Sequence, residues 1–312
     1  MKREKRFVMS RVFSLCVLHT LLFSNILYGQ TVPVNYRIYR FSGRDSVPSR
    51  YFPQSNELYL SGFDTDGKGT FYFAGGNPLQ IACFRDTAIV YRRVFDGKLS
   101  LKGIFGLRKD SIYVIADQQK ELIRLHKSGQ GEAVELELPV REICGGRMAK
   151  NSFMLYCPVA SLVNGDTVYY KEKCVYEFDY SFKMLSCKKV SQEEQEELFY
   201  PRPYSHNVPS LFYYKGDYKG YGLYWGTDCG KWQLLLTDKE GQVKYNYDIP
   251  MPADDPFSII PLQVLGIYED AEVHRPSPDF EVLRNGCFYT VGFDGKKNKL
   301  IVTEVDLSVV FP

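Results

Sequence analysis

The sequence predicts an all-β protein, a β-propeller of four-stranded antiparallel blades, with five blades and closure by the N-terminal strand. Short runs rich in Tyr, Phe, Val and Ile alternate apolar and polar residues, which is typical of β-strands. These runs recur in groups of four at a step of about forty residues, the length of a propeller repeat. The last group lacks a fourth strand, while residues 34–41, VNYRIYRF, form a strand without a group.

The first 29 residues are predicted to be a secretory signal peptide. A basic start, MKREKR, is followed by an apolar stretch at residues 12–28 and then by Gly29, which is the order of a signal peptide. An uncleaved membrane anchor is the alternative, although the stretch is short for a span. We therefore expect residues 30–312 to form a single propeller domain, secreted or in the periplasm or cell envelope, without a stable membrane span after cleavage.

Charge argues against a nucleic-acid partner. The whole chain carries a formal net charge of +2. Residues 1–29 hold five basic side chains and one acidic one, so their removal leaves the remaining chain at −2. Nucleic-acid-binding domains typically carry a basic face, so we do not expect a nucleic-acid partner for this chain.

Five repeat units can be placed along the chain. Each begins with an apolar run, and these runs start at Leu58, Leu101, Val140, Pro209 and Ile260. The following strands fall within residues 69–94, 110–139, 151–190, 220–249 and 286–306, and the last range holds only two strands. Between strands there is one predicted short helix, Ser191–Phe199, in which Ser191 and Glu194 form a capping box.

Four insertions lengthen the later repeats. They lie at residues 161–173, 191–208, 250–259 and 268–283. A degenerate unit within residues 250–283 would give six blades, and a two-sheet sandwich remains the alternative fold. Long connections are often functional, and three of these four, 161–173, 191–208 and 250–259, are expected on one face of the propeller. That face is the predicted binding face.

The strand-to-turn elements resemble a known class of proteins. LIRLHKSGQG at residues 122–131 and LLLTDKEGQV at residues 234–243 follow IYVIAD and LYWGTD. In these elements the chain resembles secreted bacterial β-propellers of the broad NHL and TolB-like type. The resemblance implies a scaffold with a binding face and no particular activity.

The strongest candidate for ligand binding is an aromatic segment at residues 199–225, with seven tyrosines, two phenylalanines and a tryptophan. Aromatic rings with polar edges suit stacking on sugars or capture of a peptide. If PRPYSHN is extended, its alternate residues point to the same side. The predicted ligand-binding residues are Tyr200, Arg202, Tyr204, His206, Asp254 and Asp255, and the expected partner is a glycan, a peptide or an envelope protein. Packing between blades is the alternative role of Tyr213, Tyr214, Tyr221 and Tyr224.

Enzymatic activity has less support. The sequence contains no G-x-S-x-G, H-E-x-x-H or P-loop motif, so no cofactor or metal is expected. A glycoside hydrolase is the alternative, with its two carboxyl groups drawn from Asp64, Glu142, Asp254 and Asp255. A structural component of an envelope assembly is the third hypothesis. DTDGKG at residues 64–69 is predicted to be a hairpin turn rather than a calcium loop.

The cysteines of the third unit raise a separate question. Cys144 and Cys157, and likewise Cys174 and Cys187, are placed symmetrically about predicted turns. Opposite positions on antiparallel strands come close enough for a disulfide. Disulfide staples and free buried thiols are both open. Zinc is disfavoured, because no C-x-x-C motif occurs.

Overall fold

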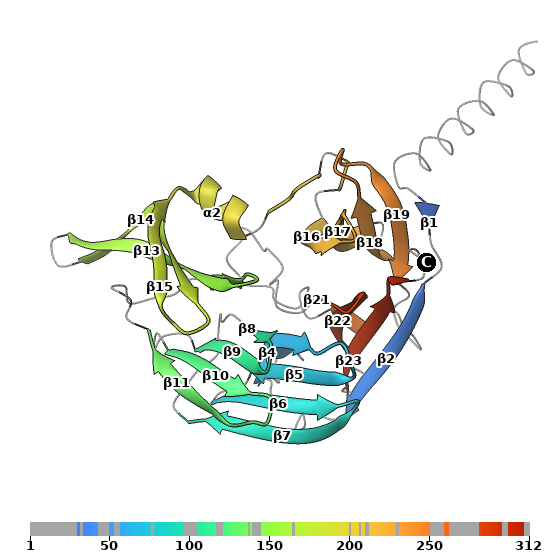
Figure 1. Cartoon of the computed structure of the whole chain (residues 1–312), viewed down its shortest axis with the longest axis horizontal. Helices are drawn as coiled ribbons and strands as arrows, with labels where there is room; N and C mark the ends of the chain where they lie inside the picture. The colour runs from blue at the N-terminus through green and yellow to red at the C-terminus, as the bar shows by residue number, and fades with distance from the viewer. Residues whose placement is uncertain are drawn as a thin grey trace, which may run out of the picture. The chain divides into compact units, whose positions relative to one another are not determined.

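The fold is known from a computed structural model (Figure 1). It describes residues 30–31, 34–42, 50–52, 57–75, 78–96, 105–116, 121–136, 138, 145–163, 166–199, 201–205, 207–209, 212–228, 231–249, 259–261, 281–294 and 299–308. The chain divides into two compact units. Unit 1 comprises Met1–Val34, Arg202–Pro250 and Pro312, and unit 2 comprises Asn35–Pro201 and Met251–Phe311.

The described residues form five antiparallel blades, one for each predicted repeat, so the chain is an all-β five-bladed propeller. The first blade has strands β3 (Arg50–Phe52), β4 (Glu57–Thr65), β5 (Thr70–Gly75), β6 (Leu79–Arg85) and β7 (Ala88–Phe95). The second has β8 (Phe105–Arg108), β9 (Ser111–Ala116), β10 (Glu121–His126) and β11 (Gly131–Glu135). The third has β12 (Gly145–Met148), β13 (Ser152–Val163), β14 (Asp166–Asp179) and β15 (Met184–Val190).

The last two blades belong to different units. The fourth, in unit 1, has β16 (Phe212–Tyr218), β17 (Tyr221–Asp228), β18 (Lys231–Thr237) and β19 (Val243–Ile249). The fifth, in unit 2, has β20 (Ile259–Pro261), β21 (Glu281–Arg284), β22 (Cys287–Asp294) and β23 (Lys299–Asp306). The described residues thus give five sheets, as predicted, and no sixth.

The predicted completion of the last blade by the N-terminal strand is confirmed. Strand β2 (Asn35–Ser42) pairs antiparallel with β23, in register from Asn35 opposite Asp306 to Ser42 opposite Lys299. A second N-terminal strand was not predicted. Strand β1 (Gln30–Thr31) adds to β19 of the fourth blade in parallel.

Two insertions contain strands rather than loops. Residues 161–173 were predicted to be a loop, but β13 and β14 continue as one hairpin as far as Val163 opposite Asp166. The two residues between them in the sequence are Asn164 and Gly165, a strong hairpin signal. The predicted insertion at residues 268–283 overlaps β21, which pairs with β22 beside the turn, while β20 pairs farther along the same strand.

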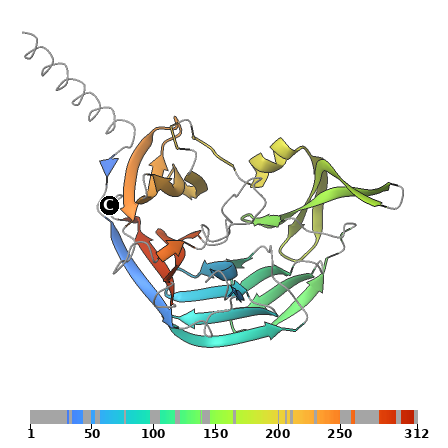
Figure 2. The same ribbon diagram turned by 180° about the vertical axis from the view of Figure 1, so that it is seen from behind.

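The predicted helix is present as α2 (Gln192–Phe199), which lies against β14 and β15 (Figures 1 and 2). Its capping box is confirmed: the Glu194 amide donates to Ser191 Oγ at 3.2 Å, and the Ser191 amide donates to Glu194 Oε2 at 2.9 Å. No described helix has the length and apolar character needed to cross a membrane.

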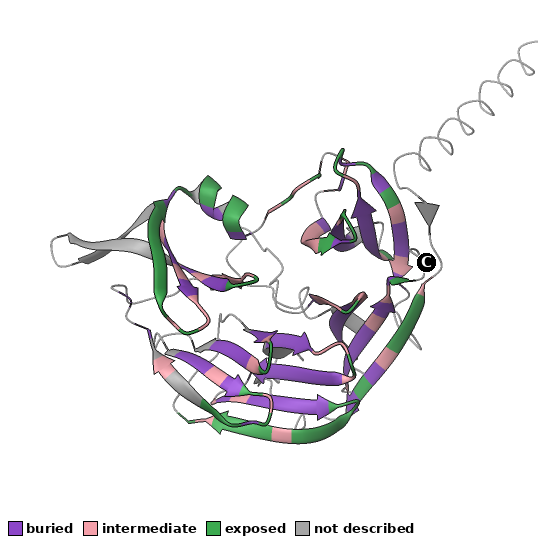
Figure 3. Ribbon diagram, viewed as in Figure 1, coloured by how far each residue is buried: buried purple, intermediate pink, exposed green. Residues whose placement is uncertain are grey.

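Hydrophobic cores lie between successive blades of unit 2, and the outer strands β7 and β15 are largely exposed (Figure 3). The core between the last and first blades is aromatic. In it, Phe41 of β2 is fully buried and its ring contacts those of Phe71, Phe73 and Phe84. Unit 1 has its own core around Phe212, Tyr224 and Leu235.

Candidate functional site

Two of the predicted ligand-binding residues, Arg202 and Tyr204, lie within the described structure, and both are exposed. The other four, Tyr200, His206, Asp254 and Asp255, lie outside the described residues, as does Glu142 of the hydrolase alternative. The local geometry therefore rests on residues 202–205 and 207–209 of unit 1, which we term the Tyr204 loop.

The expectation that this segment is extended is wrong. Pro203 and Tyr204 lie in a turn, and Tyr204 has a positive φ of 58°. The reason is a set of bonds that fold the loop back on itself. Arg202 Nη2 donates to the carbonyl oxygen of Pro209 at 3.2 Å, and the Val208 amide donates to the carbonyl oxygen of Ser205 at 3.0 Å.

The loop is also fastened to the fourth blade. The hydroxyl of Tyr224 on β17 donates to the carbonyl oxygen of Pro203. Asn207 Nδ2 donates to the carbonyl oxygen of Gly241 at 3.2 Å, and Val208 is buried in the unit 1 core. These contacts hold Tyr204 in one place at its strained backbone conformation.

The side chain of Tyr204 is 36% exposed. Its ring lies over Gly222, where a Cβ atom would be 3.5 Å from Tyr204 Cδ2. Beneath it, burial raises the pKa of Tyr224 to about 12, while the nearby charge of Arg202 opposes the rise. The Tyr224 hydroxyl therefore stays protonated at neutral pH and can keep donating to the loop.

Tyr224 is fully buried, but it packs within the core of its own blade, and packing between blades stays a prediction for the neighbouring tyrosines. Tyr213, Tyr214 and Tyr221 are half-buried. The ring of Tyr214 contacts that of Tyr224 at 5.5 Å between centroids. Most of the described aromatic residues of this segment thus belong to the blade, and among them Tyr204 is the exposed one in the loop.

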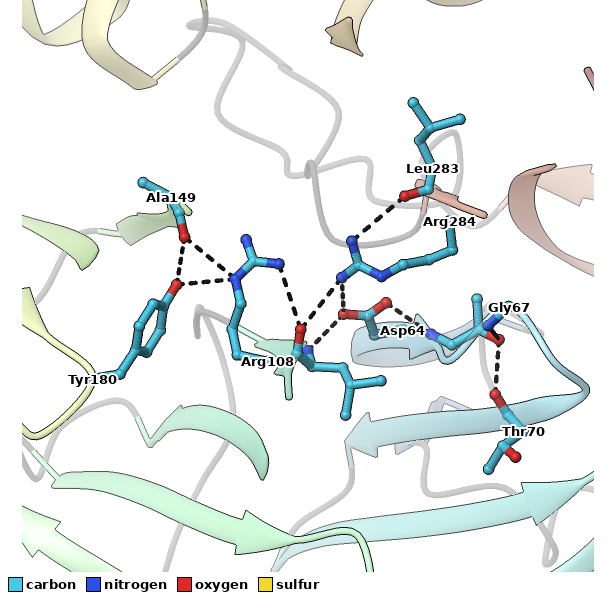
Figure 4. Close-up of polar contacts among 10 residues, drawn as sticks. Asp64, Gly67, Thr70, Arg108, Ala149, Tyr180, Leu283 and Arg284 are labelled. Atoms are coloured by element: carbon cyan, nitrogen blue, oxygen red, sulfur yellow. Dashed lines mark hydrogen bonds and ion pairs between the residues drawn. The ribbon is translucent and has the colours of Figure 1, made fainter. Parts of the chain in front are cut away.

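A second group of polar contacts, in unit 2, was not predicted (Figure 4). Its residues lie at or beside hairpin turns of several blades. Its members, which we term the polar cluster, are Asp64, Leu107, Arg108, Ala149, Tyr180 and Arg284. They come from the first, second, third and fifth blades.

Asp64 is the buried centre of one half of the polar cluster, with a relative exposure of 2%. Its Oδ2 accepts from the Leu107 amide at 2.6 Å and from Arg284 Nη2 at 2.7 Å, and its Oδ1 accepts from the Thr65 amide at 2.7 Å. Burial raises the pKa of Asp64, while Arg284 and the two amides oppose the rise. This carboxyl group is enclosed, so it cannot reach a substrate as a hydrolase would require.

Arg108 forms the other half. Its Nε donates to the Tyr180 hydroxyl at 3.1 Å and to the carbonyl oxygen of Ala149 at 3.3 Å. The Tyr180 hydroxyl donates in turn to the same Ala149 oxygen at 2.6 Å. Arg108 Nη1 and Arg284 Nη2 both approach the carbonyl oxygen of Leu107, at 3.4 and 3.5 Å.

A sequence signal for the polar cluster exists. Arg108 ends β8 and Arg284 ends β21, at the turns into β9 and β22. A basic residue at equivalent turns of different repeats is visible in the sequence once the repeats are aligned. Which residues would partner them is not visible, because the partners come from other blades.

Metal binding has no support in the described residues, where no three His, Cys, Asp or Glu side chains are grouped to hold an ion. The prediction of a turn at residues 64–69 is confirmed. Asp66 Oδ1 accepts from the amides of Lys68 at 2.8 Å and Thr70 at 3.0 Å. These bonds use the Asp66 carboxylate to hold the turn.

Of the two alternatives left open for Cys174 and Cys187, the structure has free thiols and no staple. Both are free thiols, and Cys187 is paired with Tyr176 while Cys174 is paired with Lys189. A register shift between Glu177 and Phe178 contributes to this offset of two residues. Cys174 does lie opposite Cys157 in the β13–β14 pair. Cys144 lies outside the described residues.

The chain was compared with known proteins. No protein-family model and no curated protein matches it. Among solved structures it is similar to glutaminyl cyclase from Myxococcus xanthus, with a TM-score of 0.42, 11% identity, and coverage of 90% of this chain and 98% of that one. It is also similar to a DUF4221-family protein from Bacteroides vulgatus, with a TM-score of 0.41, 10% identity and coverage of 88% and 98%.

A third similar structure is virginiamycin B lyase from Staphylococcus aureus, with a TM-score of 0.39, 9% identity and coverage of 86% and 99%. The chain therefore has a distant structural similarity to bacterial β-propellers. These proteins have diverse functions, so the similarity bears on the fold alone. The finer resemblance to the NHL and TolB-like type stays a prediction.

Proposed function

We propose that the protein is an exported binding propeller that captures a glycan, a peptide or an envelope protein on the Tyr204 loop. One observation carries the proposal: an exposed tyrosine is held at a positive φ by a loop that several side chains fasten. A bulky residue in this conformation costs roughly 1–2 kcal/mol. Such strain is typical of residues kept for binding rather than for folding.

The chemistry of the loop fits this role. A tyrosine ring has an apolar face that stacks on a sugar or an apolar side chain, and a hydroxyl that bonds to a polar group. Fixing the ring in advance reduces the entropy lost when a ligand binds. Arg202 contributes a charge beside it while its Nη2 is engaged with Pro209.

Export through residues 1–29 belongs to the same proposal. N-terminal sequencing of the protein recovered from outside the cytoplasm tests it, with cleavage before Gln30 as the expected result. An intact N-terminus would contradict export by signal cleavage while leaving the binding role to its own test.

The binding role is tested by screening the purified protein on arrays of glycans and envelope proteins, then comparing two variants on each ligand found. Tyr204→Gly removes the ring and suits the positive φ, so we expect at least tenfold weaker binding with no loss of unfolding free energy. Tyr36→Ala removes an exposed tyrosine in unit 2 and should leave binding unchanged. Failure to bind any ligand, or equal affinity of Tyr204→Gly and the unmodified protein, would overturn the proposal.

A further inference from the structure

Three hairpin turns of unit 2, β4–β5, β8–β9 and β12–β13, carry a basic residue at the same place. Lys68, Lys109 and Lys150 each stand two residues before the second strand of the hairpin, namely β5, β9 and β13. All three side chains are exposed. None has an acidic partner among the residues that the structure describes.

Hydrogen bonds bring these three turns together. The turn of the first blade is joined to the second by the bond from the Leu107 amide to Asp64. The second blade is joined to the third by the bond from Arg108 Nε to the oxygen of Ala149, the residue before Lys150. The three lysines, which lie in these turns, therefore belong to one end of unit 2.

Arg108 is the unusual member of this group. It is half-buried, and its bonds go to a hydroxyl and two carbonyl oxygens, all uncharged. No carboxylate among the described residues contacts it. Its Nη2 atom makes no bond to a described residue, whereas Nε and Nη1 are fixed by neighbours from the second and third blades. Nε and Nη1 are thus held by the protein, and the two protons of Nη2 are the donors left for an oxyanion.

Four acidic groups near these turns already have partners, and a fifth, Asp86, lies beside Gly69 of the first-blade turn with no ion pair among the described residues. Asp64 is paired with Arg284, and Asp66 accepts amides of its own turn. Asp110 is paired with Lys127, and Asp179 accepts from Ser181 and Lys183, whose bonds lower its pKa. Asp66 and Asp179 keep their charge because their partners are neutral. With Asp86, three carboxylates therefore offset three of the four charges of Arg108 and the lysines, and one positive charge is in excess. Nearby like charges repel one another, and an anion placed among them removes that cost.

We propose that this end of unit 2 binds an oxyanion group, a carboxylate, sulfate or phosphate, on Arg108. Lys68, Lys109 and Lys150 attract the remaining charges of a polyanionic ligand. The site goes beyond the Tyr204 loop, since it is built from different residues in the other unit. Arg is suited to the fixed contact because it presents its donors in one plane, and the lysines supply longer-range attraction.

The test is a calorimetric titration of the purified full chain with three probes. Oligogalacturonate presents carboxylates, a heparin-derived oligosaccharide presents sulfates, and tripolyphosphate presents phosphates. We expect at least one to bind, with affinity that falls as salt is raised from 50 to 200 mM. The probe preferred identifies the oxyanion.

Two variants that each lose one positive charge distinguish binding at a specific site from general electrostatic attraction of the probe to the protein. Arg108→Gln should weaken binding at least tenfold, while Arg93→Gln, at an exposed arginine on β7, should have little effect. Since Arg108 also links two blades, the exposed pair Lys109→Gln and Lys150→Gln provides a second test, with an expected three- to tenfold loss. Tyr204→Gly should bind these probes normally.

The proposal is overturned if none of the three probes binds the unmodified protein at millimolar concentration. It is also overturned if Arg108→Gln and Arg93→Gln weaken binding equally, because the attraction is then a property of net charge. Neither result bears on the Tyr204 loop, which is tested with other ligands and another variant.

Discussion

Asp64 links three blades through one buried side chain. Its oxygens accept from Leu107 on the second blade and from Arg284 on the fifth, while Asp64 itself lies near the end of β4 in the first blade. Breaking a buried ion pair by removing one partner typically costs about 3–5 kcal/mol. The Asp64 carboxylate thus stabilises the packing of these blades. Its ion pair also fixes Arg284 beside Arg108.

The free thiols differ in environment, and this predicts their reactivity. Cys83 is buried, and burial raises the pKa of its thiol to about 11, whereas Cys187 is exposed. Because the thiolate is the reactive form, iodoacetamide at pH 8 should alkylate Cys187 quickly and Cys83 only after unfolding. Peptide mapping by mass spectrometry measures both rates, and urea-unfolded protein is the control. Equal native rates at the two sites, or a Cys174–Cys187 disulfide, would contradict the structure.

The candidate sites differ in how far the sequence could predict them. The Tyr204 loop is local, so the aromatic density at residues 199–225 pointed to it, although its bonds to Pro209 and Gly241 and its turn were not foreseen. The polar cluster joins residues far apart: Leu107 lies 43 residues from Asp64, and Arg284 lies 220 residues from it. Such a cluster exists only once the blades are packed, so no local pattern reports the partners.

At the scale of elements, helix α2 depends on both of its ends. Its start is capped by Ser191, and at its end Arg147 Nη1 donates to the carbonyl oxygen of Leu198 at 2.6 Å. Phe199 is buried against Val175 and Val190. The helix is one or two turns long, too short to be stable alone, so these contacts hold it.

Ser191→Ala should therefore lower the free energy of unfolding by about 1 kcal/mol, because the Glu194 amide loses its acceptor. Urea unfolding followed by circular dichroism measures the change. Ser186→Ala is the matched control, since Ser186 is exposed on the outer strand β15, and its effect should stay within about 0.5 kcal/mol. Equal effects of the two substitutions would show that the cap does not stabilise the helix.

Strand positions were predictable and strand register was not. Period-two patterns place the strands because alternation is a local property. Register depends on bulges, and the irregularity between Glu177 and Phe178 contributes to moving Cys187 opposite Tyr176 rather than Cys174. The long β13–β14 hairpin could have been predicted from Asn164-Gly165, which is a strong turn signal. The signal was missed because residues 161–173 were interpreted as a loop.

For the molecule as a whole, counting strands was enough to predict the blade number and the role of β2. The last repeat unit lacked one strand, and the first strand of the chain belonged to no unit. Placing that strand in the last blade accounts for both facts, and β2 does pair with β23. Strand β1 escaped prediction because two residues carry no periodicity. Completing the last blade also covers the edge of β23, which would otherwise be open to aggregation.

Strand β2 also brings Phe41 into the aromatic core of unit 2, and this gives a test of how much that core depends on the N-terminal strand. Phe41 lies 5.6 Å from Phe71 and 5.2 Å from both Phe73 and Phe84, measured between ring centroids. Phe41→Ala should lower the free energy of unfolding by about 3–5 kcal/mol, because it removes a buried ring and leaves a cavity. Tyr36→Ala, on the same strand but 45% exposed, should cost much less. Urea unfolding compares them, and similar losses would mean that β2 contributes through its backbone pairing with β23 rather than through the core.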